Sequence, residues 1–186
     1  MEIVLVHPEI PTNTGCIARL AAATGLRLHL VEPLGFSLED RYLKRAGLDY
    51  WPLVDAVVHA DWPRAVRALE AAGERPLRER LRLFTARGGT SLFAAPLAAD
   101  DVLVFGREST GLPAELLAGH AERRVYVPIR PGVRSLNLAS VACLAVYTAM
   151  VAAGIPLPAN DGAYEPHPRR AEDVWPAEVA RRTEEA

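Results

Sequence analysis

Polar residues gather at three points of this chain where the neighbouring sequence is largely apolar. They lie in the segments NTGCIAR (13–19), GRESTGLP (106–113) and RSLNLAS (134–140). A polar side chain that is buried without a hydrogen bond is costly. Each segment therefore needs partners, which are either a ligand or another part of the chain.

The segment RSLNLAS leads into LASVACLAVYTAMVAAG, a run with very few polar side chains. Ser and Asn are common helix N-caps because their side chains accept hydrogen bonds from free backbone N–H groups. We predict a helix that begins at Ser135, with that residue as its cap. Asn137 and Ser140 then lie in the first turns of an apolar helix, where they require hydrogen-bond partners.

In NTGCIAR, Asn13 or Thr14 can cap a helix, and Gly15 permits another backbone to approach closely. Arg19 has no acidic residue three or four positions away. It therefore either takes a partner from elsewhere or remains a solvated side chain whose stem packs on the helix.

In GRESTGLP, Gly106 ends an apolar strand, Glu108 follows it, and Gly111 begins a second turn. A strand that runs into glycines can expose its backbone N–H and C=O groups to a ligand, and a carboxylate beside them can bind a hydroxyl or a cation. A plain turn with a capping serine or threonine explains the same residues equally well.

Short stretches rich in β-branched residues alternate along the chain with segments of helical periodicity. This alternation predicts an α/β domain with a mostly parallel sheet and helices on both faces. We expect Gly25 to end the first helix and Asp61 to cap the third. The predicted strands are 2–7, 26–33, 55–60, 81–86, 101–106 and 123–129, and the predicted helices are 16–25, 37–47, 61–73, a short one after 113 and a long one from Ser135.

Ligands in such sheets bind at the carboxyl ends of the strands. The unusual loops of this chain all follow strands: HPEIPTNTG, TARGGTS, GRESTGLP and PIRPGVRS. The three polar segments belong to these loops or begin directly after them. The sequence therefore predicts one site at the carboxyl edge of the sheet.

The 186 residues, half of them apolar, suit one ordinary soluble domain. The apolar run 138–154 is too short to span a bilayer comfortably and the N-terminus lacks a basic segment, so we expect a cytoplasmic protein without a membrane segment. Cys16 and Cys143 provide neither a disulfide framework nor a metal site, and we expect both in the core.

Acidic charge is concentrated at the C-terminus. Residues 159–186 carry seven acidic residues against four arginines, and the remainder carries 16 acidic against 17 basic residues. The change in composition predicts a domain at 1–155, followed by a linker and acidic tail at 156–186. A nearly neutral body does not by itself predict nucleic-acid binding.

Several enzyme classes lose support because their motifs are missing. The sequence has no phosphate loop of the type GxxxxGK[ST], no GxGxxG after the first strand, no GxSxG and no HExxH. In contrast, PEIPTNTGCIAR, LVFGRESTGLP and VPIRPGVRSLNLASVACLAVY, in this order, resemble the three motifs of the SPOUT superfamily of RNA methyltransferases. The segments HPEIPTNTG and RLHLVEPLGFSLEDRYLKRAGLDYW resemble its short TrmL-type members most closely.

The resemblance covers roughly residues 1–155 and implies a homodimer with the site at its interface. It also implies a trefoil knot near the C-terminal end of the domain, an exception to the rule that chains do not thread their own loops. No metal is implied. The implied residues are Ala86, Gly106, Val127, Ile129, Ser135 and Leu136 for S-adenosylmethionine, Arg19, Glu108, Ser135 and Asn137 for catalysis, and Asn13, Arg19, Arg41, Lys44, Arg45 and Arg134 for RNA.

The activity implied is methylation of the ribose 2′-hydroxyl of the tRNA wobble nucleotide, a cytidine or a modified uridine. Two alternatives remain open at this point: methylation of another tRNA position or of rRNA, and a non-catalytic RNA-binding protein on the same fold. For Arg41, Lys44 and Arg45, a solvated helix face is the alternative to RNA contact.

Overall fold

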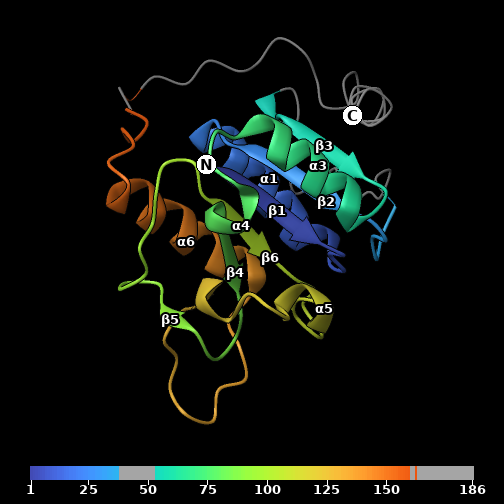
Figure 1. Ribbon diagram of the computed structural model, residues 1–186, viewed down its shortest axis with the longest axis vertical. Coiled ribbons are helices and arrows are strands. Elements are labelled where there is room, and N and C mark those ends of the chain that lie inside the picture. The colour runs from blue at the N-terminus through green and yellow to red at the C-terminus, as the bar shows by residue number, and fades with distance from the viewer. Residues whose placement is uncertain (38–52, 160–161, 163–186) are drawn as a thin grey trace.

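The computed structural model describes residues 1–37, 53–159 and 162. Within these residues one seven-stranded sheet has the order β3-β2-β1-β6-β4-β7-β5 (Figure 1). Every neighbouring pair of strands is parallel, which confirms the predicted sheet. The strands are Glu2–Val6 (β1), Arg27–Val31 (β2), Ala56–His59 (β3), Leu81–Phe84 (β4), Thr90–Ser91 (β5), Val102–Phe105 (β6) and Arg124–Tyr126 (β7).

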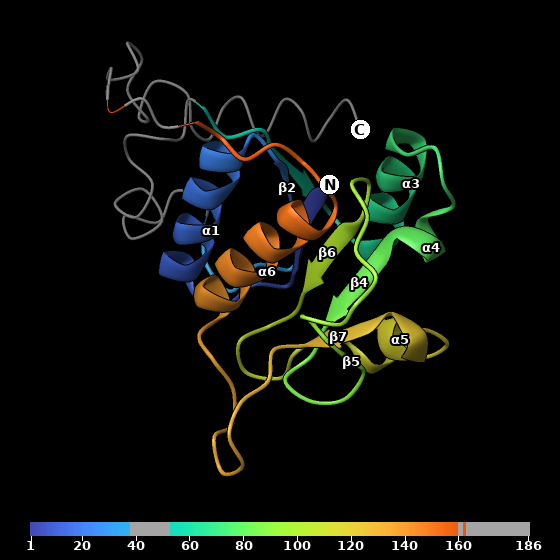
Figure 2. The ribbon, with the colours of Figure 1, turned by 90° about the vertical axis from the view of Figure 1, so that its left-hand side faces the viewer.

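Helices cover both faces of the sheet, as predicted. Figure 2 shows α1 and α6 side by side on one face, with α3 and α4 on the other. The helices are Pro11–Thr24 (α1), Trp62–Ala72 (α3), Leu77–Arg80 (α4), Ala114–Leu117 (α5) and Leu138–Ala152 (α6), with a 3₁₀ turn at Ala121–Arg123 (η2).

Strand β1 shows how the sequence builds the two layers. Successive side chains of a strand point to opposite faces of the sheet. Ile3 and Leu5 belong to the core shared with α1 and α6, whereas Val4 and Val6 belong to the core shared with α3. Because both faces of a parallel sheet are covered, its central strands are apolar without alternation.

The predicted helix ends are partly confirmed. Asp61 caps α3 by accepting a hydrogen bond from the backbone N–H of Arg64 (2.8 Å), and Gly25 ends α1 in the left-handed conformation (φ 68°). Two short elements, α4 and β5, were not predicted, because four and two residues are too few to show a period. The helix predicted over 37–47 falls, from residue 38 on, outside the described residues.

Two predicted caps were wrong. Helix α1 begins earlier, at Pro11, because proline is well suited to the first helical position and its missing N–H costs nothing there. Asn13 therefore lies in the first turn instead of capping it. Helix α6 begins at Leu138, and its cap is Asn137, whose Oδ1 accepts from the backbone N–H of Ser140 (3.2 Å). Ser135 lies ahead of the helix.

The expectation of two core cysteines was also wrong. Cys16 and Cys143 are both exposed, on the outward sides of α1 and α6. The sequences of these helices are apolar around much of their circumference, so periodicity did not show which side faces the sheet. Among the described residues, no helix is long and apolar enough to cross a membrane. The trefoil knot stays a prediction of the resemblance.

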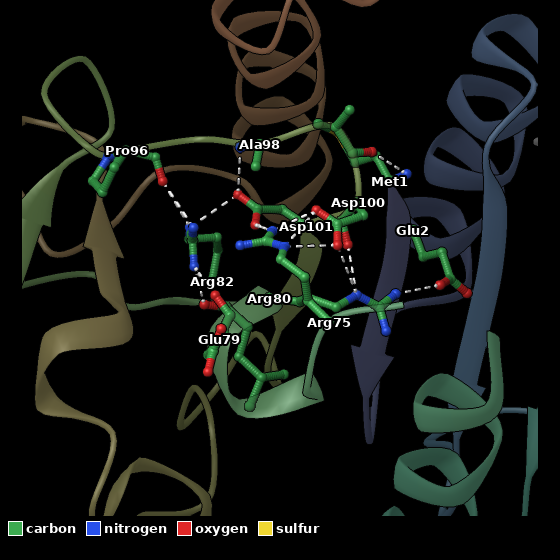
Figure 3. A network of polar contacts seen from close by, with 12 residues as sticks. Met1, Glu2, Arg75, Glu79, Arg80, Arg82, Pro96, Ala98, Asp100 and Asp101 are labelled. Atoms are coloured by element: carbon green, nitrogen blue, oxygen red, sulfur yellow. Dashed lines mark hydrogen bonds and ion pairs between the residues drawn. The ribbon is translucent and has the colours of Figure 1, made fainter. Parts of the chain in front are cut away.

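Arginine–carboxylate contacts close the amino-terminal edge of the sheet (Figure 3). The Arg80 side chain is only 2% exposed, and it donates to the backbone carbonyls of Asp100 and Leu69 (2.8 Å each) and to Glu2 Oε1 (3.1 Å). Arg82 contacts the fully buried Asp101 carboxylate (3.0 Å). Charged groups tolerate such burial only when they are paired and hydrogen-bonded in this way.

A buried pair of histidines extends this region under α3. His29 Nδ1 and His59 Nε2 lie 2.8 Å apart, and His29 Nε2 lies 2.7 Å from Glu2 Oε2. Burial, reinforced by the His29 charge, lowers the pKa of His59 to about 4. Burial raises the pKa of Glu2, but the His29 hydrogen bond and nearby positive charges outweigh this and hold it below its ordinary value.

This pair predicts acid sensitivity. Between pH 6.5 and about 4 the unfolded chain protonates His59 while the folded chain does not, so the free energy of unfolding falls as pH falls through this range. Acid titration of Glu2 acts in the same direction. In urea denaturation at a series of pH values, His59→Gln should flatten the pH dependence of the free energy of unfolding, whereas His120→Gln, at a half-buried position outside this pair, should not. Parallel curves for wild type and His59→Gln would contradict this assignment.

Candidate active site

The carboxyl ends of β4, β6 and β7 and the loop before α6 surround a cavity of about 570 Å³. A cavity of this size holds a small organic ligand or cofactor. Its lining contains all the residues expected to bind the cofactor: Ala86, Gly106, Val127, Ile129, Ser135 and Leu136. Besides Ser135, which was expected in both roles, it contains four further residues expected to act in catalysis or RNA binding: Asn13, Glu108, Arg134 and Asn137.

A chain of hydrogen bonds joins the three polar segments beside this cavity. The Asn137 amide Nδ2 donates to Asn13 Oδ1 (2.9 Å), and Asn13 Nδ2 donates to Glu108 Oε1 (2.9 Å). The other carboxylate oxygen of Glu108 accepts from the backbone N–H of Glu9 (2.9 Å). The partners that the sequence required for Asn13 and Asn137 are therefore each other and Glu108, so these residues act as a scaffold of the site.

A second set of contacts fastens the loop after β1 to the loop after β6. Glu9 accepts hydrogen bonds from the Ser109 backbone N–H (3.0 Å) and hydroxyl (2.9 Å). These hydrogen bonds hold the pKa of Glu9 below its usual value. Both loops therefore present a fixed surface to the cavity, although they are about 100 residues apart in sequence.

The turn after β6 requires its glycines. A Cβ on Gly106 would lie 2.2 Å from the Gly111 carbonyl carbon and the Leu112 nitrogen, and Gly111 has a φ of 76°. Arg107 N–H donates to the Gly111 carbonyl (3.1 Å), and Gly111 N–H donates back (2.9 Å). The chain thus folds tightly onto itself where it lines the cavity, as expected for a loop that offers backbone groups to a ligand.

Two arginines tie down the long loop between β7 and α6. Arg134 donates to the Ser109 carbonyl (2.6 Å), and Arg87 donates to the Val133 carbonyl (2.6 Å). Both side chains belong to exposed residues. Arg134 therefore lies at the cavity mouth, where its remaining N–H donors are available to an anionic ligand.

Other predicted residues are placed differently. Arg19 is exposed on α1 and does not line the cavity of its own chain. Arg41, Lys44 and Arg45 lie outside the described residues. Within the described residues, no cluster of three or more His, Cys, Asp or Glu side chains is suited to hold a metal.

Sequence reasoning missed several residues of the site. Phe84 and Phe105 stack with ring centroids 4.5 Å apart and line the cavity, where they favour a planar or apolar part of a ligand. Their position as the last residues of two buried strands was the available signal. Glu9 and Arg107 were also missed, although each lies inside a loop that the sequence had singled out.

Comparison with known proteins agrees with this geometry. The SpoU rRNA Methylase family matches residues 1–147, most of the chain and all three polar segments. The chain belongs to this family. Its resemblance to SPOUT methyltransferases is thereby confirmed.

Relatives within the family are close. A protein of Burkholderia ambifaria named tRNA (cytidine(34)-2'-O)-methyltransferase is 46% identical over 154 residues, which span 82% of this chain and 96% of that protein. A solved structure described as "Structural insights into the 2-OH methylation of C/U34 on tRNA" has 46% identity and a TM-score of 0.72, covering 80% of this chain and 92% of that one.

More distantly related solved structures share the fold. An AdoMet-bound rRNA methyltransferase from Sinorhizobium meliloti has 24% identity and a TM-score of 0.67, covering 81% of this chain and 55% of that one. The α/β methyltransferase architecture predicted from the sequence is thus the fold of the family.

The hydrogen-bond chain predicts a defined effect for Glu108→Ala. Removing the carboxylate leaves the Asn13 amide and the Glu9 N–H without an acceptor, which should cost about 1–3 kcal/mol of folding free energy and loosen the cavity. Denaturant unfolding measures the stability change, with Glu70→Ala on the exposed side of α3 as control. Equal stability of the two variants would show that Glu108 is not a scaffold residue.

Proposed function

We propose that this protein transfers a methyl group from S-adenosylmethionine to the ribose 2′-hydroxyl of the wobble nucleotide, a cytidine or modified uridine, in the tRNA anticodon loop. The observation that carries the proposal is the 46% identity with a named tRNA (cytidine(34)-2'-O)-methyltransferase over nearly that protein's whole length. The cofactor-sized cavity beside the joined polar segments supports a working enzyme over a non-catalytic binding protein, because RNA binding alone requires no such cavity.

The cavity fits S-adenosylmethionine. Its volume of about 570 Å³ lies in the usual range for ligand sites, the stacked Phe84 and Phe105 offer a wall for a planar ring, and the tight turn at Gly106 exposes backbone groups. The residues that would hold it are Ala86, Gly106, Val127, Ile129, Ser135 and Leu136. When bound, it supplies an electrophilic methyl group on a sulfonium centre.

The protein must then align the ribose 2′-oxygen with the methyl carbon and stabilise the negative charge that develops on this oxygen during the attack. Arg19 is our candidate for this electrostatic assistance. A guanidinium is effectively always protonated, so it suits phosphate binding and stabilisation of a developing alkoxide better than proton abstraction. Ser135, at the mouth of the cavity, and Asn137, at the start of α6, orient the reacting region.

A homodimer explains how an exposed Arg19 takes part. The outward sides of α1 and α6 lie side by side (Figure 2), and α6 exposes Leu144, Tyr147 and Val151 there, at 38%, 38% and 63%. Exposed apolar surface of this kind favours association. A dimer formed through this face brings Arg19 to the boundary between protomers, where the family resemblance puts the site.

We also propose a domain organisation and a cellular location for this protein. Residues 1–155 form the methyltransferase domain and 156–186 a linker with an acidic tail, which is supported by a family match that ends at 147. Because its substrate is tRNA, we place the protein in the cytoplasm.

Methylation assays on RNA test the function directly. Purified protein with radiolabelled S-adenosylmethionine should label total tRNA and not rRNA, and nuclease mapping with mass spectrometry should find the 2′-O-methyl group at nucleotide 34 of selected tRNAs. A methyl group found at another tRNA position or in rRNA would show that the substrate is different from the one proposed. Cofactor and RNA binding without label would indicate a non-catalytic protein.

Arg19→Lys tests the catalytic assignment. Lysine keeps the charge but loses the planar fork, so the methylation rate should fall by at least tenfold while the calorimetric affinity for S-adenosylmethionine is unchanged. Arg67→Lys, an exposed position on α3, serves as control. Full activity of Arg19→Lys would refute the assignment.

A further inference from the structure

His7 has an unusual backbone at the end of β1. Among the described residues it is the one non-glycine residue with a positive φ (53°). L-residues avoid this region because Cβ approaches the following carbonyl, and observed cases gather at functional sites. The His7 backbone N–H donates to the Val31 carbonyl (2.9 Å), which holds the residue in place.

The His7 side chain contacts Arg107, which lines the cavity. His7 Nδ1 lies 3.1 Å from Arg107 Nη2. A guanidinium only donates, so Nδ1 accepts this hydrogen bond and the ring proton is on Nε2. The Arg107 backbone is fixed by its paired hydrogen bonds to Gly111. The Arg107 side chain is therefore held by His7 and its backbone by Gly111.

Arg107 differs from the arginines of the opposite edge of the sheet. Arg75, Arg80 and Arg82 each contact a carboxylate there (Figure 3). Within the described part of the chain, Arg107 forms no ion pair; the nearby Glu9 carboxylate accepts hydrogen bonds from Ser109, and the Arg107 charge adds only the last of the causes that affect the Glu9 pKa. Among the residues that the structure describes, four of its five N–H donors have no hydrogen-bond partner, which leaves the guanidinium able to bind an anion at the cavity.

We propose that Arg107, held by His7, binds a phosphate of the RNA backbone beside the target nucleotide, with His7 as a positioning residue. The inference rests on the proposed function, because it identifies how this site holds its RNA. Phosphate is the anion that an RNA substrate brings to the mouth of the cavity, and a guanidinium matches its oxygens with two parallel hydrogen bonds.

The protonation state of His7 suits this role. Burial, followed by the Arg107 charge, lowers the pKa of His7, and a backbone hydrogen bond to Glu32 opposes the shift only in part. The ring is therefore neutral at neutral pH and its Nδ1 can accept from Arg107. At acid pH, protonation of His7 removes the acceptor and adds a positive charge that repels the Arg107 guanidinium. Arg107 then loses its fixed position, so RNA affinity should fall at acid pH.

The first experiment removes the phosphate ligand. Arg107→Gln should raise KM for tRNA by about tenfold, with kcat and the affinity for S-adenosylmethionine unchanged. It should also reduce the slope of log K against log salt by about 0.7 to 1 for an anticodon stem-loop RNA, measured by fluorescence anisotropy. Arg67→Gln on α3 should change neither quantity. An unchanged KM and salt slope in Arg107→Gln would overturn the proposal.

The second experiment separates positioning from folding. His7→Gly suits the left-handed backbone but removes the acceptor, so KM for tRNA should rise several-fold without loss of thermal stability. His7→Asn tolerates the same backbone and keeps an acceptor, and it should restore KM and abolish its acid dependence. In the Arg107→Gln background, His7→Gly should cause no further rise in KM for tRNA. An additive effect there would show that His7 does not act through Arg107.

These outcomes are distinct from failure of the proposed function. If the wild type methylates no RNA, the function is wrong, yet the salt slope of stem-loop binding still tests Arg107 as a phosphate ligand. If the wild type methylates tRNA and Arg107→Gln behaves identically, only the Arg107 inference is wrong.

Discussion

The geometry of the site depends on a series of hydrogen bonds in which each amide accepts from the preceding group and donates to the next. It begins at the cap of α6, where Asn137 Oδ1 accepts from the backbone N–H of Ser140. The Asn137 Nδ2 group then donates to Asn13. Asn13 accepts at one end and donates at the other, and the Glu108 carboxylate, which only accepts, terminates the series. A helix cap thereby fixes the orientation of two amides and of a loop on another strand. The cavity is built around this ordered set of contacts.

Much of the fold was readable from the sequence because its cause is local. Strand and helix periodicity, the cap at Asp61 and the stop at Gly25 depend on near neighbours in the chain, and the structure agrees. The location of the cavity was also predictable, since parallel strands bring their carboxyl ends to one edge. The motif residues Glu108 and Asn137 were recognised as residues of the site; their contacts give them a scaffold role, and their part in catalysis stays a prediction.

What the sequence did not predict depends on contacts between distant segments. Ser135 and Asn137 are both good caps, and the choice of Asn137 is linked to Asn13, which lies 124 positions away. The His29–His59 pair arises from strand register, with His29 one strand from His59 and both on the face under α3. The outward position of Cys16 and Cys143 follows from which side of two apolar helices meets the sheet. None of these is encoded in a local pattern.

The strand order has a consequence for the chain as it is made. Strand β6 lies between β1 and β4 and pairs Glu2 with Val102, so the free edge of β1 has no partner until about 100 residues later. An unpaired strand edge is a template for contact with other chains, and pairing over such sequence separation is slow. A half-sheet of β3, β2 and β1 that forms before β6 is made would therefore expose the β1 edge, and insertion of β6 both covers that edge and completes the cavity wall at Phe105 and Gly106.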